Sequence, residues 1–554
     1  MEKAHNKHLL FALLINGVFA SFVVLFFYTD YETNDDQLML MLLTGSFSGT
    51  GSHYIMYVNS LLSFPLQLLY TSFPMFPWYP LLQYLTVFLS LTSITYVLMS
   101  KDTRLGISGS ILLLCAFGFD FYTRMQFTKV AGCASAAGIV LGLHALAEVN
   151  NRMPNFIFSS ILLLLGCCFR FKMSLVVVAM LSVLIPFYTY EFLKDKDYKK
   201  LRGYLIWLSL VILIFFSLAK INNEIYEKNK KWADYMEFNT YRSQLLDRSF
   251  PAYSENEEQY QTMGITQSDI ILYRTWDFGD PDIFTPANVK TMADMRTSPS
   301  VDSAFFKSFI TTVLAGYIDY SWFPALLISC AFAIYASRKN SIWALFQIFL
   351  VMAFSMYLFY YQRYLKNRVD ICVFFASTLA MLIIYLDTRD KQSSTHIKDI
   401  ILAICLISIV FMPSYVKYAK NNADADTLAT QHREVVDYIS NDSSNLYLVS
   451  LMSSNIWQDA YGIFEPMLPN TMSNICFMGG CFAFTPEWDK TLERWNIDNP
   501  YTDCINNEHI YIIDNKHIDS IVAYINRHYD PNAKAVLINT LNGCSFYQIV
   551  SQTP

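Results

Sequence analysis

The stretch LLFALLINGVFASFVVLFF at residues 9–27, followed by YTDYETNDDQLMLMLL at residues 28–43, decides the fold class. Its first part is 19 residues long and carries no charge, close to the ~20 residues that an α-helix needs to cross a bilayer. A cleaved signal peptide is the competing interpretation, because Lys3 and Lys7 precede the run, but its apolar core would be only about 7–15 residues. Residues 9–27 therefore predict a membrane-spanning helix.

The composition extends this prediction to most of the chain. Of 554 residues, 54% are hydrophobic and 16% are charged, whereas a soluble globular chain has roughly a quarter charged residues. The net charge of −6 offers no basic surface for nucleic acid. Together with residues 9–27, the further apolar runs predict an α-helical polytopic membrane protein of about 11 transmembrane helices; these runs lie at 80–100, 105–119, 128–147, 156–169, 173–190, 203–219, 320–337, 341–361, 369–386 and 400–416.

The distribution of Lys and Arg over the short loops predicts the orientation. With the N-terminus in the cytoplasm, fifteen of these residues fall in inner loops and seven in outer loops, and cytoplasmic loops are the ones enriched in Lys and Arg. We expect a multi-pass protein of a bacterial plasma (inner) membrane. Residues 1–416 would form the membrane domain, and the pieces 29–79, 221–304 and 417–554 would lie outside.

Each outward piece shows local patterns. In the first outer loop, residues 37–43 and 54–73 read as helices on the outer membrane face, separated by the break at Gly45–Gly51. In the large outer loop, a helix is expected around 232–246, and Thr266–Asp269 resembles a capping box. In residues 417–554, short strands at 446–451, 510–513 and 535–538 and a helix at 520–529 predict a small extracytoplasmic α/β domain.

The cysteines of the C-terminal piece are four in number, Cys476, Cys481, Cys504 and Cys544. An even number in an oxidising compartment permits one or two disulfides, and their pairing stays open. Their spacing is not that of a zinc site.

The stretch after the first span carries Asp30, Glu32, Asp35 and Asp36, and residues 29–79 contain no Lys or Arg. Four acids at a membrane surface need a proton, a metal or a cationic neighbour. One interpretation is helix capping at Gln37 by the preceding polar residues. The other is a carboxylate held near the bilayer to accept a proton from a sugar hydroxyl.

The order of parts resembles that of the GT-C membrane glycosyltransferases, which use polyprenyl-phosphate-linked sugars as donors and include protein O-mannosyltransferases, aminoarabinose lipid A transferases and oligosaccharyltransferase catalytic subunits. A single span, an acidic pair opening an outer loop, a multi-span core, a long outer loop and an outward C-terminal domain follow one another in both. Asp35–Asp36 stands where the family usually has Asp-Glu or Asp-Asp. The resemblance implies that Asp35 is the catalytic base, with Asp36 as the alternate or orienting neighbour.

The second outer loop departs from the family pattern. The family often has an acid before the fourth span, whereas this chain reads FDFYTRMQFTK at 119–129, with Asp120 as its only acid and Gln126 in the nearer place. A divalent ion prefers several oxygen ligands, so a metal-dependent mechanism is doubtful. We expect no metal-ligating residues and no required cofactor.

A lipid-phosphate donor needs cations at the membrane surface. The candidates on short outer loops are Arg124, Arg170, Arg363 and Arg368, joined by Lys172 and Lys366. Arg363 is the first choice, because no acid lies within six positions of it, whereas Asp370 stands near Arg368. Lipid headgroup contacts or ion pairs are the alternative for each of them.

Three further residues are candidates for substrate binding, namely His53, Gln126 and Trp276. His53 would otherwise be a polar residue at the membrane interface, and Trp276 would otherwise pack the loop onto its core.

The sequence thus predicts a glycosyltransferase that moves a sugar from a polyprenyl-phosphate donor to a lipid-linked glycan, lipid or protein at the outer face of the membrane, in cell-surface glycan assembly. A polysaccharide polymerase or ligase with a diphosphate donor is the near alternative. A transporter or flippase for lipid-linked glycans is a different class, and it would place ionisable residues or broken helices at mid-bilayer.

Overall fold

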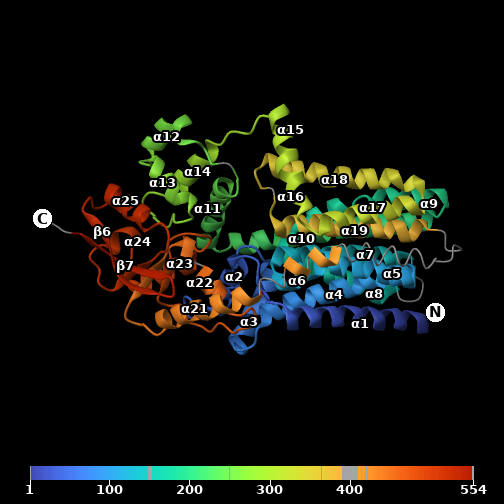
Figure 1. Cartoon of the computed structure of the whole chain (residues 1–554), viewed down its shortest axis with the longest axis horizontal. Coiled ribbons are helices and arrows are strands. Elements are labelled where there is room, and N and C mark those ends of the chain that lie inside the picture. The colour runs from blue at the N-terminus through green and yellow to red at the C-terminus, as the bar shows by residue number, and fades with distance from the viewer. Residues whose placement is uncertain are drawn as a thin grey trace.

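The structure is a computed structural model that describes residues 2–147, 152–248, 250–363, 365–389, 410–413, 415–417, 422–453 and 455–551. The molecule is elongated, with a bundle of long helices at one end and the C-terminal sheet at the other (Figure 1). Side chains on the outside of the bundle are apolar and exposed, as in Leu213, Phe216 and Leu345. Such a surface is stable in a bilayer and not in water.

Eight helices within the described residues are long and apolar enough to cross a membrane. They are α1 (Glu2–Phe26), α4 (Trp78–Lys101), the Thr103–Thr123 helix, α7 (Phe127–Ala147), α8 (Arg152–Leu181), α10 (Tyr198–Glu227), the Arg338–Tyr360 helix and α19 (Asn367–Thr388). A bent pair, Ser303–Ile318 and Trp322–Ala336, meets at 88° and would be a ninth span. The prediction of a polytopic helical membrane protein is confirmed, and the expected span at 400–416 lies largely outside the described residues.

The element α8 contains the expected span at 156–169 and the first part of the one at 173–190. Gly166 and Ser174 both approach Ser135 of α7: the Ser135 and Ser174 hydroxyls hydrogen-bond at 2.7 Å, and a Cβ on Gly166 would lie 2.3 Å from the Ser135 hydroxyl oxygen. Eight residues of continuous helix would separate them by about 12 Å. Arg170, midway between them, has non-helical angles, φ −161° and ψ 100°. The chain therefore reverses at Arg170 and runs back toward α9 (Leu184–Lys194).

The first outer loop holds the two expected helices, α2 (Asn34–Thr44) and α3 (Ser60–Ser72). Gly45, with φ 75°, ends α2, and the Asn59 side chain caps α3 six residues later than the sequence suggested. The helix α3 keeps apolar side chains exposed, as expected for a surface helix, whereas α2 is enclosed by protein from Asp36 onward. The Gln37 side chain donates to the carbonyl of Trp457, so the C-terminal part of the chain covers α2.

The large outer loop is mostly helical. It contains α11 (Lys230–Leu246), α12 (Glu257–Thr262), α13 (Gln267–Arg274), α14 (Pro286–Asp294) and α15 (Ser303–Phe309). The helix expected around 232–246 and the capping box at Thr266–Asp269 are both confirmed.

The C-terminal region folds around a five-stranded sheet with the order β4-β3-β5-β7-β6. Its strands are β3 (Leu446–Val449), β4 (Ile475–Phe477), β5 (Ile510–Ile513), β6 (Ala533–Leu541) and β7 (Cys544–Ser551), and its main helices are α21 (Asn422–Ser440), α22 (Asn455–Ala460), α23 (Pro486–Trp495) and α25 (Ile518–His528). The three predicted strands and the predicted helix are present, and β4 and β7 were not predicted. Cys476, Cys481, Cys504 and Cys544 are all free thiols.

The large outer loop and the C-terminal sheet share buried polar contacts. Asp280 accepts hydrogen bonds from the hydroxyls of Tyr524 and Tyr529 at 2.7 and 2.5 Å. Asp269, also buried, pairs with Arg527 and with His528. The two outer pieces therefore hold each other in place above the helix bundle.

Candidate active site

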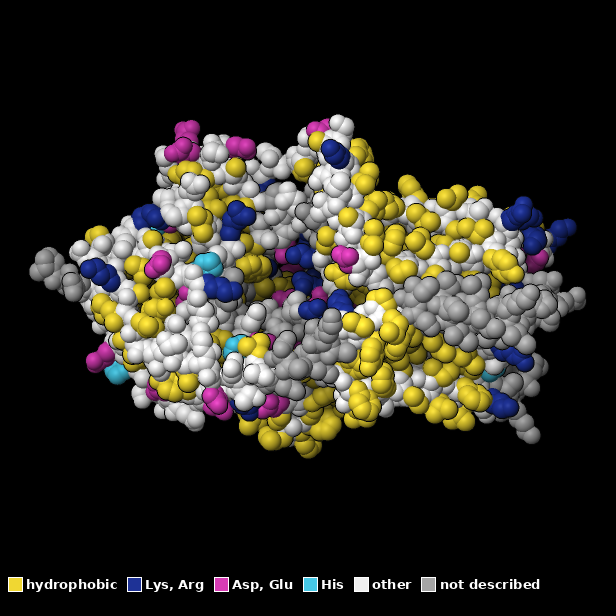
Figure 2. All heavy atoms as spheres, viewed as in Figure 1, with side chains coloured by type: hydrophobic (Ala, Val, Ile, Leu, Met, Phe, Trp, Pro, Cys, Tyr) yellow, Lys and Arg dark blue, Asp and Glu magenta, His cyan; other side chains and the backbone are white. Residues whose placement is uncertain are grey.

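A cavity of about 700 Å³ lies between the helix bundle and the outer parts of the chain. Segments from distant parts of the chain line it, among them α2, the turn at Arg170, α11, the turn before α19 and the loop around Gly479–Gly480. In Figure 2 it is the hollow in the middle of the molecule, where Lys and Arg side chains gather beside the apolar surface of the bundle. A lipid-borne ligand could therefore reach it from the membrane side.

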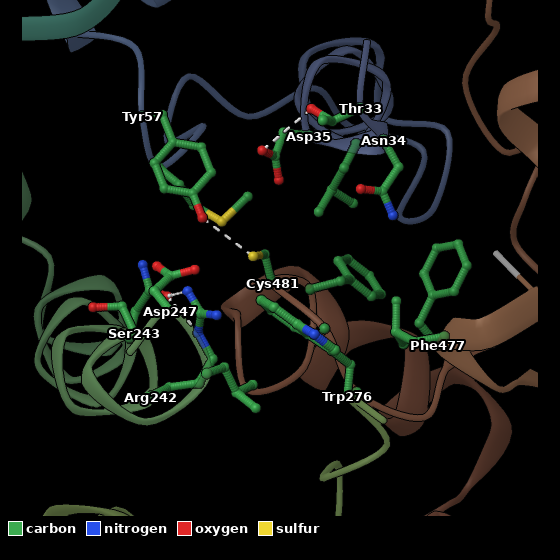
Figure 3. A pocket seen from close by; sticks show the side chains of 18 of the residues that line it. Thr33, Asn34, Asp35, Tyr57, Arg242, Ser243, Asp247, Trp276, Phe477 and Cys481 are labelled. Atoms are coloured by element: carbon green, nitrogen blue, oxygen red, sulfur yellow. Dashed lines mark hydrogen bonds between the residues drawn. The ribbon is translucent and has the colours of Figure 1, made fainter. Parts of the chain in front are cut away.

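The two neighbouring carboxylates of α2 point in different directions. Asp35 lines the cavity (Figure 3), where the Thr33 hydroxyl lies 3.4 Å from its Oδ2. Asp36 is fully buried behind it and accepts hydrogen bonds from Tyr79 at 2.8 Å, Gln83 at 2.7 Å and the backbone N–H of Phe127 at 3.2 Å. Burial raises the pKa of Asp36 to about 7. Only Asp35 can meet a ligand, and Asp36 fixes the start of α2.

The cavity lining is strongly cationic. It contains only two carboxylates, Asp35 and Asp247, against seven cations, which are Arg170, Lys172, Arg242, Arg363, Lys366, Arg368 and Lys516. In a concave site surrounded by protein, the electrostatic potentials of charges of the same sign add up. The cavity is therefore suited to an anion such as a phosphate.

Arg170 is held by aromatic rings. Tyr57 and Phe127 stack with centroids 5.6 Å apart, and the Arg170 guanidinium lies 5.3 and 4.8 Å from their centroids. Its Nη1 donates to the Thr128 hydroxyl at 3.3 Å. Among the described residues, no other hydrogen bond engages this guanidinium, and the two rings fix the orientation of the cation.

The expectation that Arg363 is unpaired is wrong. Its Nη2 lies 3.2 Å from Oδ2 of Asp247, which comes from the end of α11. Counting acids along the sequence missed this partner because it lies 116 positions away.

Contrary to the sequence expectation, Arg363 has an ion-pair partner and Arg368 has none among the described residues. Asp370 is buried in α19 and accepts from the Tyr317 hydroxyl at 3.4 Å instead of pairing with Arg368. Within the described residues, the Arg368 side chain makes no ion pair or hydrogen bond to another side chain. Arg368 lines the same cavity as Arg170, and both Arg368 and Arg363 interact electrostatically with Arg170.

Three candidates from the sequence lie outside this cavity. Arg124 is exposed on β2 (Arg124–Met125), which pairs with β1 (Asp30–Tyr31). His53 packs its ring against Tyr54 and Phe64. Gln126 is buried, and its side-chain oxygen accepts from the N–H of Thr128 at 2.6 Å. None of the three is placed to contact a ligand in the cavity, whereas Trp276 does line it.

The acidic stretch after the first span is balanced by a buried lysine. Lys129 Nζ lies 2.6 Å from the Glu32 carboxylate, pairs with Asp120 and donates to the carbonyl of Arg124 at 2.9 Å. Asn367, next to Arg368, also donates to Asp120. The sequence left a proton, a metal or a cationic neighbour as the partner of the acidic stretch, and for Glu32 the partner is a cationic neighbour, Lys129. Within the described ranges, no three His, Cys, Asp or Glu residues are grouped so that they could hold a metal ion.

Several cavity residues have unusual backbone angles. Met56 and Trp276 line the cavity with φ of 64° and 74°, and Gln362 and Leu365, with φ of 56° and 53°, flank Arg363. Positive φ angles strain residues other than glycine, and such strained residues cluster at ligand sites.

Sequence reasoning missed Arg242, Lys516, Tyr57 and Cys481, all of which line the cavity. The Tyr57 hydroxyl lies 3.1 Å from the Cys481 sulfur, joining the first outer loop to the C-terminal region. The only sequence signal was the Gly-rich stretch around Cys481, which marks a close backbone approach.

No protein-family model matches the chain, and no curated protein matches it. Solved structures are similar over most of its length. With ArnT from Cupriavidus metallidurans, solved bound to undecaprenyl phosphate, the similarity covers 97% of each chain at 10% identity and a TM-score of 0.42. With the archaeal oligosaccharyltransferase AglB from Archaeoglobus fulgidus, solved with an inhibitory peptide and a dolichol-phosphate, it covers 97% of this chain and 74% of that chain, at 9% identity and a TM-score of 0.42.

Proposed function

We propose that this chain is a membrane glycosyltransferase that moves a sugar from a polyprenyl-phosphate donor to an acceptor at the outer face of the plasma membrane, in cell-surface glycan assembly. The observation that carries the proposal is the presence of Asp35 in a cationic cavity next to the apolar helix bundle. A carboxylate for the acceptor proton and cations for a lipid phosphate are the two requirements of such a transfer.

In the proposed reaction the carboxylate accepts a proton and the arginines stabilise the leaving phosphate. Asp35 accepts the proton of the acceptor hydroxyl, whose oxygen forms the new bond to the anomeric carbon of the sugar. The bond between that carbon and the phosphate oxygen breaks, and the polyprenyl phosphate leaves with the bonding electron pair. Arg170 and Arg368, which both line the cavity, stabilise the negative charge of the leaving phosphate.

The cavity also fits the lipid part of the donor. Its wall includes apolar side chains of α2 and of the turn at Arg170, such as Leu38, Met41 and Phe171. These lie beside the cations, so a phosphate at the cations would leave its isoprenoid chain on the apolar side.

Purified protein and a synthetic farnesyl-phosphate sugar test this proposal. Incubation with a lipid extract of the native membrane as acceptor should release farnesyl phosphate and produce a glycosylated acceptor, both detected by mass spectrometry. Asp35→Asn should abolish both products, because Asn keeps the size but cannot accept the proton. A transporter would leave the donor and acceptor chemically unchanged, and that result with several donor sugars would overturn the proposal.

A further inference from the structure

We infer that Arg242, with Trp276 and Asn239, forms a second anion subsite, which receives a carboxylate or phosphate group carried by the acceptor or by the transferred sugar. This inference rests on the proposed function and adds a substrate class to it: one of the two reacting molecules is acidic at a position other than the donor phosphate.

Arg242 is almost completely buried, with 2% of its surface exposed, yet it lines the cavity. Its Nε and Nη2 donate to the side-chain oxygen of Asn239 at 2.9 and 2.6 Å. Its Nη1 is buried and has no hydrogen-bond partner within the described residues. A buried N–H group without an acceptor is unfavourable, so the guanidinium is suited to an acceptor supplied by a ligand.

The positive charge of Arg242 has no carboxylate bonded to it among the residues that the structure describes. Asp247, which follows the last residue of α11, acts on Arg242 electrostatically but forms its ion pair with Arg363. Cys481 and Tyr57 lie close by as neutral groups, since burial raises the pKa values of both. A buried cation without a bonded carboxylate is unfavourable, and an anionic ligand would lower that cost.

The surroundings hold the guanidinium in a fixed position. Its carbon lies 4.9 Å from the centroid of the Trp276 ring, a cation–π contact. The Trp276 carbonyl accepts from the N–H of Gly480 at 2.9 Å, and a Cβ on Gly479 would lie 1.8 Å from the same oxygen. Only glycine allows this approach, so the loop around Gly479–Gly480 sets the position of Trp276 and thereby of Arg242.

Arg242 enters the cavity from α11, whereas Arg170 comes from the turn in α8 and Arg368 from the start of α19. The Tyr57 ring lies against the Arg170 guanidinium and within electrostatic range of Arg242. Figure 3 shows Asp35 entering the cavity from one wall and Arg242 from the opposite one, with Tyr57 and Cys481 between them. If the sugar lies at Asp35 and its phosphate at Arg170, Arg242 faces a third part of the site. The acceptor, or a substituent of the sugar, would occupy that part.

Binding of methyl glucuronide and methyl glucoside to the purified full-length chain tests the subsite, because the two probes differ only at C6, where a carboxylate replaces a hydroxymethyl group. The wild type should bind the glucuronide at least about tenfold more tightly, as expected for a charge-assisted contact. Arg242→Gln should lose this preference while still binding farnesyl phosphate, which also shows that it is folded. Arg368→Gln is the matched control and should keep the preference while binding farnesyl phosphate more weakly.

Two arms identify the source of the anionic group. If the acceptor carries it, the preference should persist when the donor site is saturated with farnesyl-phosphate glucose. If the transferred sugar carries it, Arg242→Gln should weaken binding of farnesyl-phosphate glucuronate and not of farnesyl-phosphate glucose.

The inference fails if the wild type shows no preference for the acidic probe in either arm, or if Arg242→Gln keeps it. Its failure is separable from that of the proposed function. Asp35→Asn should abolish transfer and keep glucuronide binding, so an active Asp35→Asn protein would contradict the proposed base and leave the subsite untouched.

Discussion

The guanidinium of Arg363 and the carboxylate of Asp247 form an ion pair, with Nη2 of the arginine 3.2 Å from Oδ2 of the aspartate. The pair joins the turn before α19 to the end of α11, so it ties the helix bundle to the large outer loop. It also engages the arginine that the sequence favoured as the phosphate ligand. Arg368 and Arg170 are therefore the better candidates for that role.

The first prediction concerns Arg368. Arg368→Gln should weaken binding of farnesyl phosphate to the purified protein by roughly ten- to a hundredfold, because a charge-assisted contact is worth about 1.5–3 kcal/mol. Arg363→Gln is the matched comparison on the same turn. It should have the smaller effect on affinity, because the ion pair with Asp247 already offsets the positive charge of Arg363. The reverse order of the two variants would restore Arg363 as the principal ligand.

The second prediction concerns the buried ion cluster of Lys129. Lys129→Met would leave the carboxylates of Glu32 and Asp120 together without their cation, and breaking a buried pair in this way costs roughly 3–5 kcal/mol. We expect a clear drop in the thermal midpoint of the detergent-solubilised protein. Adding Asp120→Asn should recover part of the loss, and a midpoint equal to that of the wild type would contradict the cluster's stabilising role.

The third prediction is a pH dependence of stability. Burial raises the pKa of Asp36 to about 7, and those of Asp30 and Asp277 likewise. A carboxyl with a raised pKa binds its proton more tightly in the folded state, so the free energy of unfolding falls as the pH rises from about 4 to about 7. Between pH 5 and pH 8 the thermal midpoint of Asp36→Asn should fall less than that of the wild type.

Asp35→Asn is the control for this experiment, because it changes the charge of the neighbouring residue in the cavity. Asp30 and Asp277 should still contribute to the slope in the Asp36 variant. Identical slopes for wild type and Asp36→Asn would show that Asp36 does not hold a proton in the folded protein.

The fourth prediction is the orientation in the membrane. Residue 197 lies between α9 and α10, and residue 440 ends α21; α9 and α21 lie toward opposite ends of the elongated molecule (Figure 1). The bias of Lys and Arg predicts that residue 197 is cytoplasmic and residue 440 is outside. With the native cysteines removed, an impermeant thiol reagent applied to intact cells should label Ser440→Cys and not Asp197→Cys; labelling of position 197 would invert the topology.

The sequence predicted those features that depend on local pattern. Uncharged runs of helical length located the spans, and the position of Asp35 directly after the first span identified the carboxylate that faces the cavity. The pair of short apolar runs at 156–169 and 173–190 was recognised because Arg170 and Lys172 separate them, and the structure turns at Arg170.

Features that depend on contacts between distant segments were not predictable. Asp247 neutralises Arg363 across the cavity, and Lys129 neutralises Glu32 from a different span. Arg242 was missed because nothing in its own helix shows that Trp276 and the C-terminal region would bury it. The positions of His53 and Gln126 in the sequence were compatible with a site near the membrane face. In the structure the His53 ring packs against Phe64, and the Gln126 amide oxygen accepts a hydrogen bond from the backbone N–H of Thr128.

The most direct test of the central claim, that Asp35 is the base of a glycosyl transfer, is the level of polyprenyl-phosphate sugars in native cells. Mass spectrometry of lipid extracts would compare cells expressing wild type, Asp35→Asn or no copy of the protein, at matched protein levels. We predict that Asp35→Asn cells accumulate the same lipid-linked sugar as the deletion strain. Donor levels in Asp35→Asn cells equal to those of the wild type, with the deletion strain raised, would contradict the claim.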